Sequence, residues 1–145
     1  MTDNKKIRIH IKNNHWAPGS FPTDAEGEKV FTITNSHFEK AFMKFPKIKE
    51  KVEIFIDWDE DNFNSSMSSS DILIAWNFPT SNLKKNSPNL KWIHCISAGI
   101  EHLLPLDWMF EKLILTNNSG VHSKKAGEYG LMSVLMLQNH LPKII

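Results

Sequence analysis

The chain has 145 residues, of which 41% are hydrophobic, and its formal net charge at pH 7 is +1. This length and apolar fraction suit one globular domain with a core of its own. A net charge this close to zero gives no electrostatic attraction for nucleic acid or an anionic membrane. No apolar run reaches membrane-spanning length, so we expect neither nucleic acid nor a membrane as a partner. The polar amino terminus lacks a signal-peptide core and the single cysteine, Cys95, excludes an internal disulfide, which together predict a cytoplasmic protein.

Short apolar runs alternate with helix-like or loop segments along the chain. Such alternation predicts parallel strands joined by right-handed crossovers. We expect five strands, at residues 7–11, 52–56, 72–76, 90–96 and 113–115.

The connections differ in character. Ser36 and Glu39 have the spacing of a capping box, apolar residues follow at helical intervals, and Pro46 ends the helix, which we expect to pack on the sheet. Residues 60–70 are serine-rich and predict only a short, poorly packed helix, while residues 81–86 have room for a turn or two. Residues 14–28, with two prolines and two glycines, are expected to form a long loop.

The last segment, residues 123–141, has apolar side chains on every side of a predicted helix. A helix that is apolar all round must be buried all round, and a small sheet can cover only one side of it. The sequence therefore predicts an absent neighbour, either a second domain or a second subunit, with a central helix of one compact domain as the alternative. We divide the chain into a domain at residues 1–121 and a crossover helix at residues 122–145.

Two glycine-containing loops follow the last two predicted strands: Ser97-Ala98-Gly99-Ile100 and residues 118–121. Ligands of open parallel sheets bind beyond the carboxyl ends of the strands, where backbone amides point outward. Gly99 lets the backbone approach an anion closely, and successive amides in a tight turn form an anion nest. A tight strand-to-helix turn without a ligand is the other reading of this pattern.

A longer pattern includes these loops: Leu90-Lys91-Trp92-Ile93, then residues 97–103, Leu115-Thr116-Asn117, Gly120-Val121-His122 and Glu128. It resembles the N-terminal half of the D-isomer-specific 2-hydroxyacid dehydrogenases. The resemblance implies a flavodoxin-like three-layer α/β domain with strand order 2-1-3-4-5 and a C-terminal interdomain helix. In that family the domain binds substrate, and a following Rossmann domain supplies NAD or NADP for hydride transfer to a 2-keto acid or from a 2-hydroxy acid.

Carried onto this chain, the resemblance implies that Ser97 and the amides of Ala98, Gly99 and Ile100 hold the substrate carboxylate. It places His122 near the substrate, although a helix-cap or surface role for this residue stays open. It also places Phe78, after the third strand, in the floor of the cleft, a position that packing alone also explains.

The arginine, glutamate and histidine that perform chemistry in the family follow its cofactor fingerprint, and this sequence contains no G-x-G-x-x-G. We therefore expect no catalytic residue, no metal site and no tight NAD or NADP binding in this chain, and no hydride transfer by it alone. The expected partners are a small 2-keto or 2-hydroxy acid and a second copy bound through the C-terminal helix. The alternative is a free-standing truncated anion-binding or regulatory module that dimerises through that helix.

A receiver-type module is a poor alternative because its phosphoacceptor site needs acidic residues after the first and third strands. This chain has Asn13-Asn14 and Trp76-Asn77 there. Its acidic cluster, Asp57, Asp59, Glu60 and Asp61, follows the second strand instead.

Overall fold

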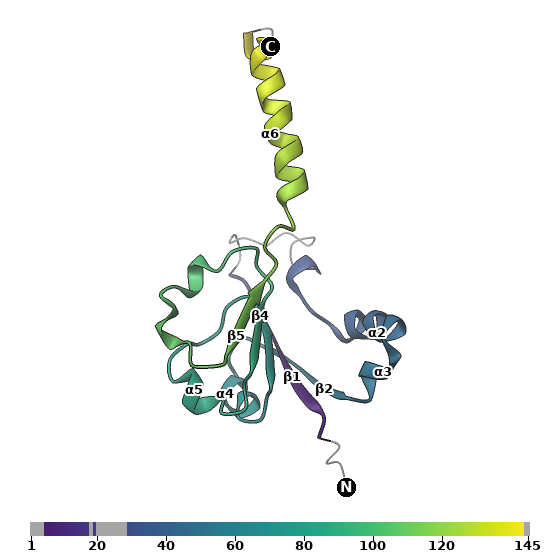
Figure 1. Cartoon of the computed structure of the whole chain (residues 1–145), viewed down its shortest axis with the longest axis vertical. Helices are drawn as coiled ribbons and strands as arrows, with labels where there is room; N and C mark the ends of the chain where they lie inside the picture. Colours follow the sequence, from purple (N-terminus) through teal and green to yellow (C-terminus); the bar gives the residue numbers. More distant parts are fainter. Residues whose placement is uncertain (1–4, 18, 20–28, 144–145) are drawn as a thin grey trace.

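A computed structural model describes residues 5–17, 19 and 29–143 and has an α/β fold (Figure 1). Five parallel strands form one sheet in the order β2-β1-β3-β4-β5. This arrangement, together with a C-terminal helix, is consistent with a flavodoxin-like three-layer domain, so the predicted fold class and strand order are confirmed. The strands are β1 (Ile7–Asn13), β2 (Val52–Trp58), β3 (Ile72–Ala75), β4 (Trp92–Cys95) and β5 (Ile114–Asn117).

The core lies on one face of the sheet, beneath two short helices, α4 (Phe63–Met67) and α5 (Leu83–Asn86). Phe63 and Met67 are buried against that face, so the expectation of a poorly packed segment is wrong. The two residues are four positions apart and share one side of the helix, while the intervening serines cost little to leave near water. Cys95 is buried in the same core, as the sequence predicts.

The first connection contains α2 (Asn35–Lys44) and α3 (Pro46–Lys49). The start of α2 is two residues earlier than expected: the N-cap is Thr34, whose N–H donates to Nδ1 of His37 at 3.1 Å, and Glu39 instead pairs with Lys49 at 3.2 Å. No residue of α2 is buried, so the expectation that it packs closely on the sheet is also wrong. The half-buried ring of Phe38 lines a hollow between helix and sheet instead.

Helix α6 (Ser123–Gln138) extends away from the sheet, and none of its residues is buried (Figure 1). The predicted helix is therefore present, whereas its burial by a neighbour stays a prediction. No helix among the described residues is long and apolar enough to cross a membrane. The described residues also include a helical segment at residues 29–31 and the 3-10 turns η1 (Glu101–Leu103), η2 (Leu106–Trp108) and η3 (Leu141–Lys143). Of the long loop expected at residues 14–28, positions 18 and 20–28 lie outside the described residues.

Candidate functional site: a groove at the carboxyl edge of the sheet

A groove of about 840 Å³ lies between the α2 segment and the sheet face that α4 and α5 do not cover. One wall comes from residues 30–33 with Phe38 and Ala41 of α2, and the other from Ile74, Trp76 and Ile96. The sheet forms this wall because alternate residues of β3 and β4 face away from the core. The end of the groove is formed by the loops after β4 and β5, the two loops expected from the sequence to share a cleft.

Hydrogen bonds fix the loop after β4 through its carbonyl groups. Nδ2 of Asn117 donates to the Ala98 carbonyl at 3.0 Å, Oγ of Ser97 donates to the Gly99 carbonyl at 2.5 Å, and the Leu103 N–H donates to the Ile100 carbonyl at 2.9 Å. The Asn118 side chain and N–H also hold this loop, through the carbonyls of residues 96 and 97. The two glycine-containing loops are thereby joined into one unit.

The N–H groups of the same three residues behave differently. Among the residues that the structure describes, the amides of Ala98, Gly99 and Ile100 have no acceptor. All three residues are half-buried, so leaving these donors unpaired costs free energy unless water or a ligand accepts from them. Three consecutive free donors, with their carbonyls already occupied, are the groups that an anion or another multiple acceptor would need.

Glu101 is the one carboxylate among the residues that line the groove. Its Oε2 lies 2.1 Å from the position that a Cβ atom would take on residue 99. The φ angle of Gly99 is outside the left-handed region, unlike that of Gly120 at 88°, so residue 99 needs glycine for space and not for its backbone conformation. An anion that binds to the loop must therefore share this end of the groove with the Glu101 carboxylate.

Four imidazoles also line the groove, those of His37, His94, His102 and His122. His102 donates from Nε2 to the Trp76 carbonyl at 2.7 Å, and Nδ1 of His94 is 3.0 Å from Oγ1 of Thr116. Each ring offers a hydrogen-bond donor or acceptor to the groove. The described lining of the groove contains no lysine or arginine.

The structure brings together four of the six residues that the resemblance singles out: Ser97, Ala98, Gly99 and His122 all line the groove. Ile100 supplies its amide to the loop, but its side chain packs against the core. Phe78 is not among the residues that line the groove. Its ring is buried and meets Trp108 edge to face at 5.3 Å, on the opposite face of the sheet.

Sequence reasoning missed the remaining histidines, Glu101 and the α2 wall. His94 carries a usable signal, since it alternates with Ile93 and Cys95 and must face away from the core that those residues enter. Glu101 and His102 lie within the quoted pattern, yet nothing in their spacing indicates that both side chains turn back toward the groove.

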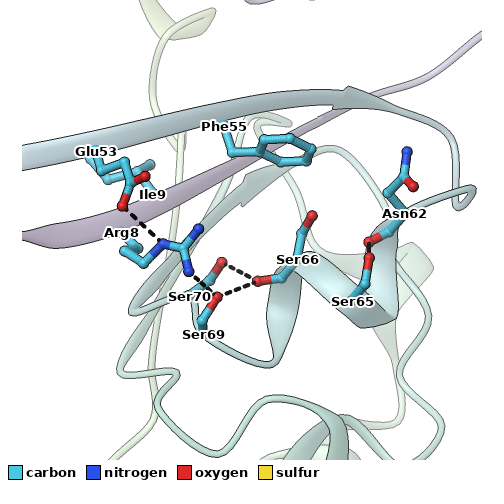
Figure 2. Close-up of a pocket in the computed structure, with 9 residues that line it drawn as sticks. All are labelled: Arg8, Ile9, Glu53, Phe55, Asn62, Ser65, Ser66, Ser69 and Ser70. Carbon is cyan, nitrogen blue, oxygen red and sulfur yellow. Dashed lines mark hydrogen bonds and ion pairs between the residues drawn. The ribbon is translucent and has the colours of Figure 1, made fainter.

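Arg8, the only arginine, is far from this loop along the strands, near the start of β1. It lines a separate cavity of about 360 Å³ at the amino end of the sheet, where Nε lies 3.1 Å from Oε2 of Glu53 and Nη1 donates to Oγ of Ser69 (Figure 2). Its charge is thus paired locally, and it cannot clamp a ligand held by the loop after β4.

Comparisons of the chain with protein-family models, with curated proteins and with solved structures give no match. Within the described residues, no group of three or more histidine, cysteine, aspartate or glutamate side chains is arranged to hold a metal ion. The loops after β4 and β5 carry Gly99 and Gly120 singly.

Proposed function

We propose that this chain is a carboxylate-binding domain for a small 2-keto or 2-hydroxy acid, equivalent to the substrate domain of an NAD(P)-dependent D-2-hydroxyacid dehydrogenase. The observation that carries the proposal is the set of three unpaired amides at Ala98, Gly99 and Ile100. Charge-assisted hydrogen bonds to a carboxylate would satisfy these donors. The sequence resemblance supports the same loop independently of the geometry.

The groove supports a small ligand in particular. Its walls are largely apolar, apart from Thr32 and His37 on the α2 side and His94 on the sheet side, and its other polar groups lie on the loops after β4 and β5. An acid with a short carbon chain would place its carboxylate at the amides and its remaining atoms among Trp76, Ile96 and the imidazoles. The ligand's keto or hydroxyl oxygen would then lie within the region lined by His102 and His122.

The test is a titration of the uniformly ¹⁵N-labelled chain with glyoxylate, followed by amide chemical shifts. We expect the largest shifts at residues 98–100, with saturation. Glycolaldehyde, which is similar in size but uncharged, should leave the same amides almost unshifted. Shifts of residues 98–100 that are equal for both compounds, or absent with glyoxylate, would exclude carboxylate recognition by this loop.

A second candidate function rests on α6. Its exposed apolar residues favour an anion-binding or regulatory module that dimerises through this helix: Tyr129, Leu131, Met132, Val134, Leu135 and Leu137. A second copy packed along α6 would cover those on one side of the helix, as part of the roughly 1,600 Å² that a standard protein interface buries. The two candidates share the anion loop and differ in what covers α6.

A further inference from the structure

A second polar cluster lies at the carboxyl end of β1, away from the groove. In the sheet, β2 lies on one flank of β1 and β3 lies on the other. The order of the strands therefore reverses at β1, and the boundary between β1 and β3 is a topological switch point. Ligands of open α/β sheets bind in the crevice at such a point. A cavity of about 350 Å³ is present there, and its lining includes Lys12, Asn14, Asn77, Asp59 and Glu60.

Lys12 is the unusual member of this cluster because only 4% of it is exposed. Its Nζ lies 2.5 Å from Oδ1 of Asn14 and 3.3 Å from Oδ1 of Asn77, and both amides line the cavity. None of the ion pairs among the described residues includes Lys12. A lysine with a structural role is normally paired with a carboxylate when its neighbours exclude water.

The burial of Lys12 makes its amine easier to deprotonate. Burial lowers the pKa of Lys12, and the negative charges of Glu60 and Asp59 oppose this only in part. A buried amine that loses its proton has a free lone pair, which is the property of lysines that react with carbonyl groups.

Carboxylates surround the mouth of the cavity. Asp59 is held by His15, whose backbone N–H donates to Oδ1 at 2.9 Å and whose Nδ1 lies 2.5 Å from Oδ2. Burial raises the pKa of Asp59. The two hydrogen bonds and the charge of His15 lower the pKa by more than burial raises it, so the net pKa is below its usual value. Glu60 and Asp61 are exposed beside it. This charge repels anions, so the ligand class differs from that of the groove.

We propose that Lys12 is a nucleophilic amine that forms a reversible imine with a small uncharged aldehyde. The Nζ lone pair attacks the carbonyl carbon, a C–N bond forms, and the carbonyl oxygen takes up a proton while the nitrogen loses one. The resulting hydroxyl is then protonated and leaves as water as the C=N bond forms, and the nitrogen gives up its remaining proton, which restores the one that was taken up. Amine and aldehyde thus give imine and water without any change in oxidation state, and hydrolysis restores both.

The experiment is reductive labelling of the intact chain with acetaldehyde and limiting cyanoborohydride at pH 7, followed by peptide mapping with mass spectrometry. Exposed Lys84 and Lys85 serve as internal controls. We expect Lys12 to be ethylated at least about tenfold faster than either control, because burial lowers its pKa and leaves more of its amine unprotonated. Labelling of Lys12 at or below the rate of Lys84 would overturn the proposal.

Two further arms test the folded site itself. In urea the preference for Lys12 should disappear, and its persistence there would show that local sequence and not the cavity is responsible, which also overturns the proposal. The rate of labelling of Lys12 relative to that of Lys84 should be lower with glyoxylate than with acetaldehyde, because glyoxylate is negatively charged. Equal or faster relative labelling by glyoxylate would contradict an uncharged ligand, whatever the result at residues 98–100.

Discussion

The carboxylate of Glu101 occupies the space above Gly99, with Oε2 only 2.1 Å from where a Cβ atom of residue 99 would stand. The loop with three unpaired amides therefore has a negative charge of its own chain beside it. Because the contacting atoms are at the far end of a flexible side chain, Glu101 can move aside when space is needed. If the loop binds anions as proposed, substitution at either residue should change its affinity for them.

Gly99→Ala should weaken glyoxylate binding at least about tenfold, the loss of one hydrogen bond to a charged group. The added methyl group fills the approach to the amides and displaces Glu101, at little cost in stability because Glu101 is flexible. Isothermal titration calorimetry measures the affinity. Gly127→Ala is the matched control, since its methyl group would meet nothing within 4 Å. Unchanged affinity in Gly99→Ala would argue against the loop as the binding site.

Glu101→Gln should strengthen glyoxylate binding by about threefold to tenfold, because it removes a like charge near the ligand in partly screened surroundings. Glu111→Gln removes the same charge at an exposed position outside the groove and should leave the affinity unchanged. The gain should shrink as salt concentration rises. Tighter binding in both variants would indicate an effect of the net charge of the protein. An unchanged affinity in Glu101→Gln would show that this carboxylate does not act on the bound anion.

His10 should make the stability of the fold depend on pH. It is fully buried, its ring meets Phe55 and Phe63 edge to face, and neither ring nitrogen has a partner among the described residues. Burial lowers the pKa of His10 from 6.5 to about 4, an effect that Asp57 opposes and Lys12 reinforces. Between pH 6.5 and about pH 4, the unfolded chain therefore binds a proton at His10 that the folded chain does not bind. The free energy of unfolding falls by up to about 3 kcal/mol as the pH falls over this range.

Urea denaturation at several pH values measures this slope. His10→Leu should flatten it, even where it lowers the absolute stability through imperfect packing. His140→Asn removes an exposed imidazole and should leave the slope as it is. A slope that is equally steep in His10→Leu would assign the pH dependence to other groups.

Asp71 should contribute more to stability than exposed ion pairs do. Its Oδ1 accepts from Lys91 at 2.9 Å and its Oδ2 accepts from the Arg8 N–H at 3.1 Å, which ties β1 to the start of β3. Burial raises the pKa of Asp71. The hydrogen bonds from Lys91 and Arg8 lower the pKa by more than burial raises it, so the net pKa is depressed. Its contribution is therefore present above the unfolded pKa, 3.8, and is lost as the pH falls through the lower, folded value.

At pH 7, Asp71→Asn should cost about 1–2 kcal/mol of unfolding free energy, since the amide replaces a charged acceptor with a neutral one. Glu39→Gln, which breaks the exposed pair with Lys49, should cost less than about 0.5 kcal/mol. Thermal and urea denaturation compare the two variants. Equal costs would place Asp71 among ordinary surface residues.

Helix α6 should mediate self-association. Leu131 and Leu135 are exposed and lie on one side of the helix, so replacing both with glutamate should convert a dimer into a monomer. Sedimentation velocity at tens of micromolar detects the change, and Gln138→Glu is the charge control on the same helix. A wild-type chain that sediments only as a monomer would contradict dimerisation through α6.

Much of the fold follows from local patterns. The alternation of apolar runs with turns located all five strands within a few residues, and the all-round apolar segment located α6, because both depend on near neighbours in the sequence. Packing of the connections was less predictable. Phe63 and Met67 are buried although they lie in a serine-rich segment, whereas α2 has a helical pattern and no buried residue, and neither outcome depends on local propensity alone.

The sequence by itself determined that the glycine loops follow neighbouring strands, and hence that Ser97, Gly99 and His122 come near one groove. Only the tertiary structure decided that the carbonyls of the loop are occupied while its amides are free, and that Glu101 covers Gly99. It likewise decided that Lys12 meets Asn77 across 65 positions of sequence. Parallel strands bring carboxyl ends together whatever their separation along the chain, and hydrogen-bond partners at that edge are chosen by three-dimensional packing.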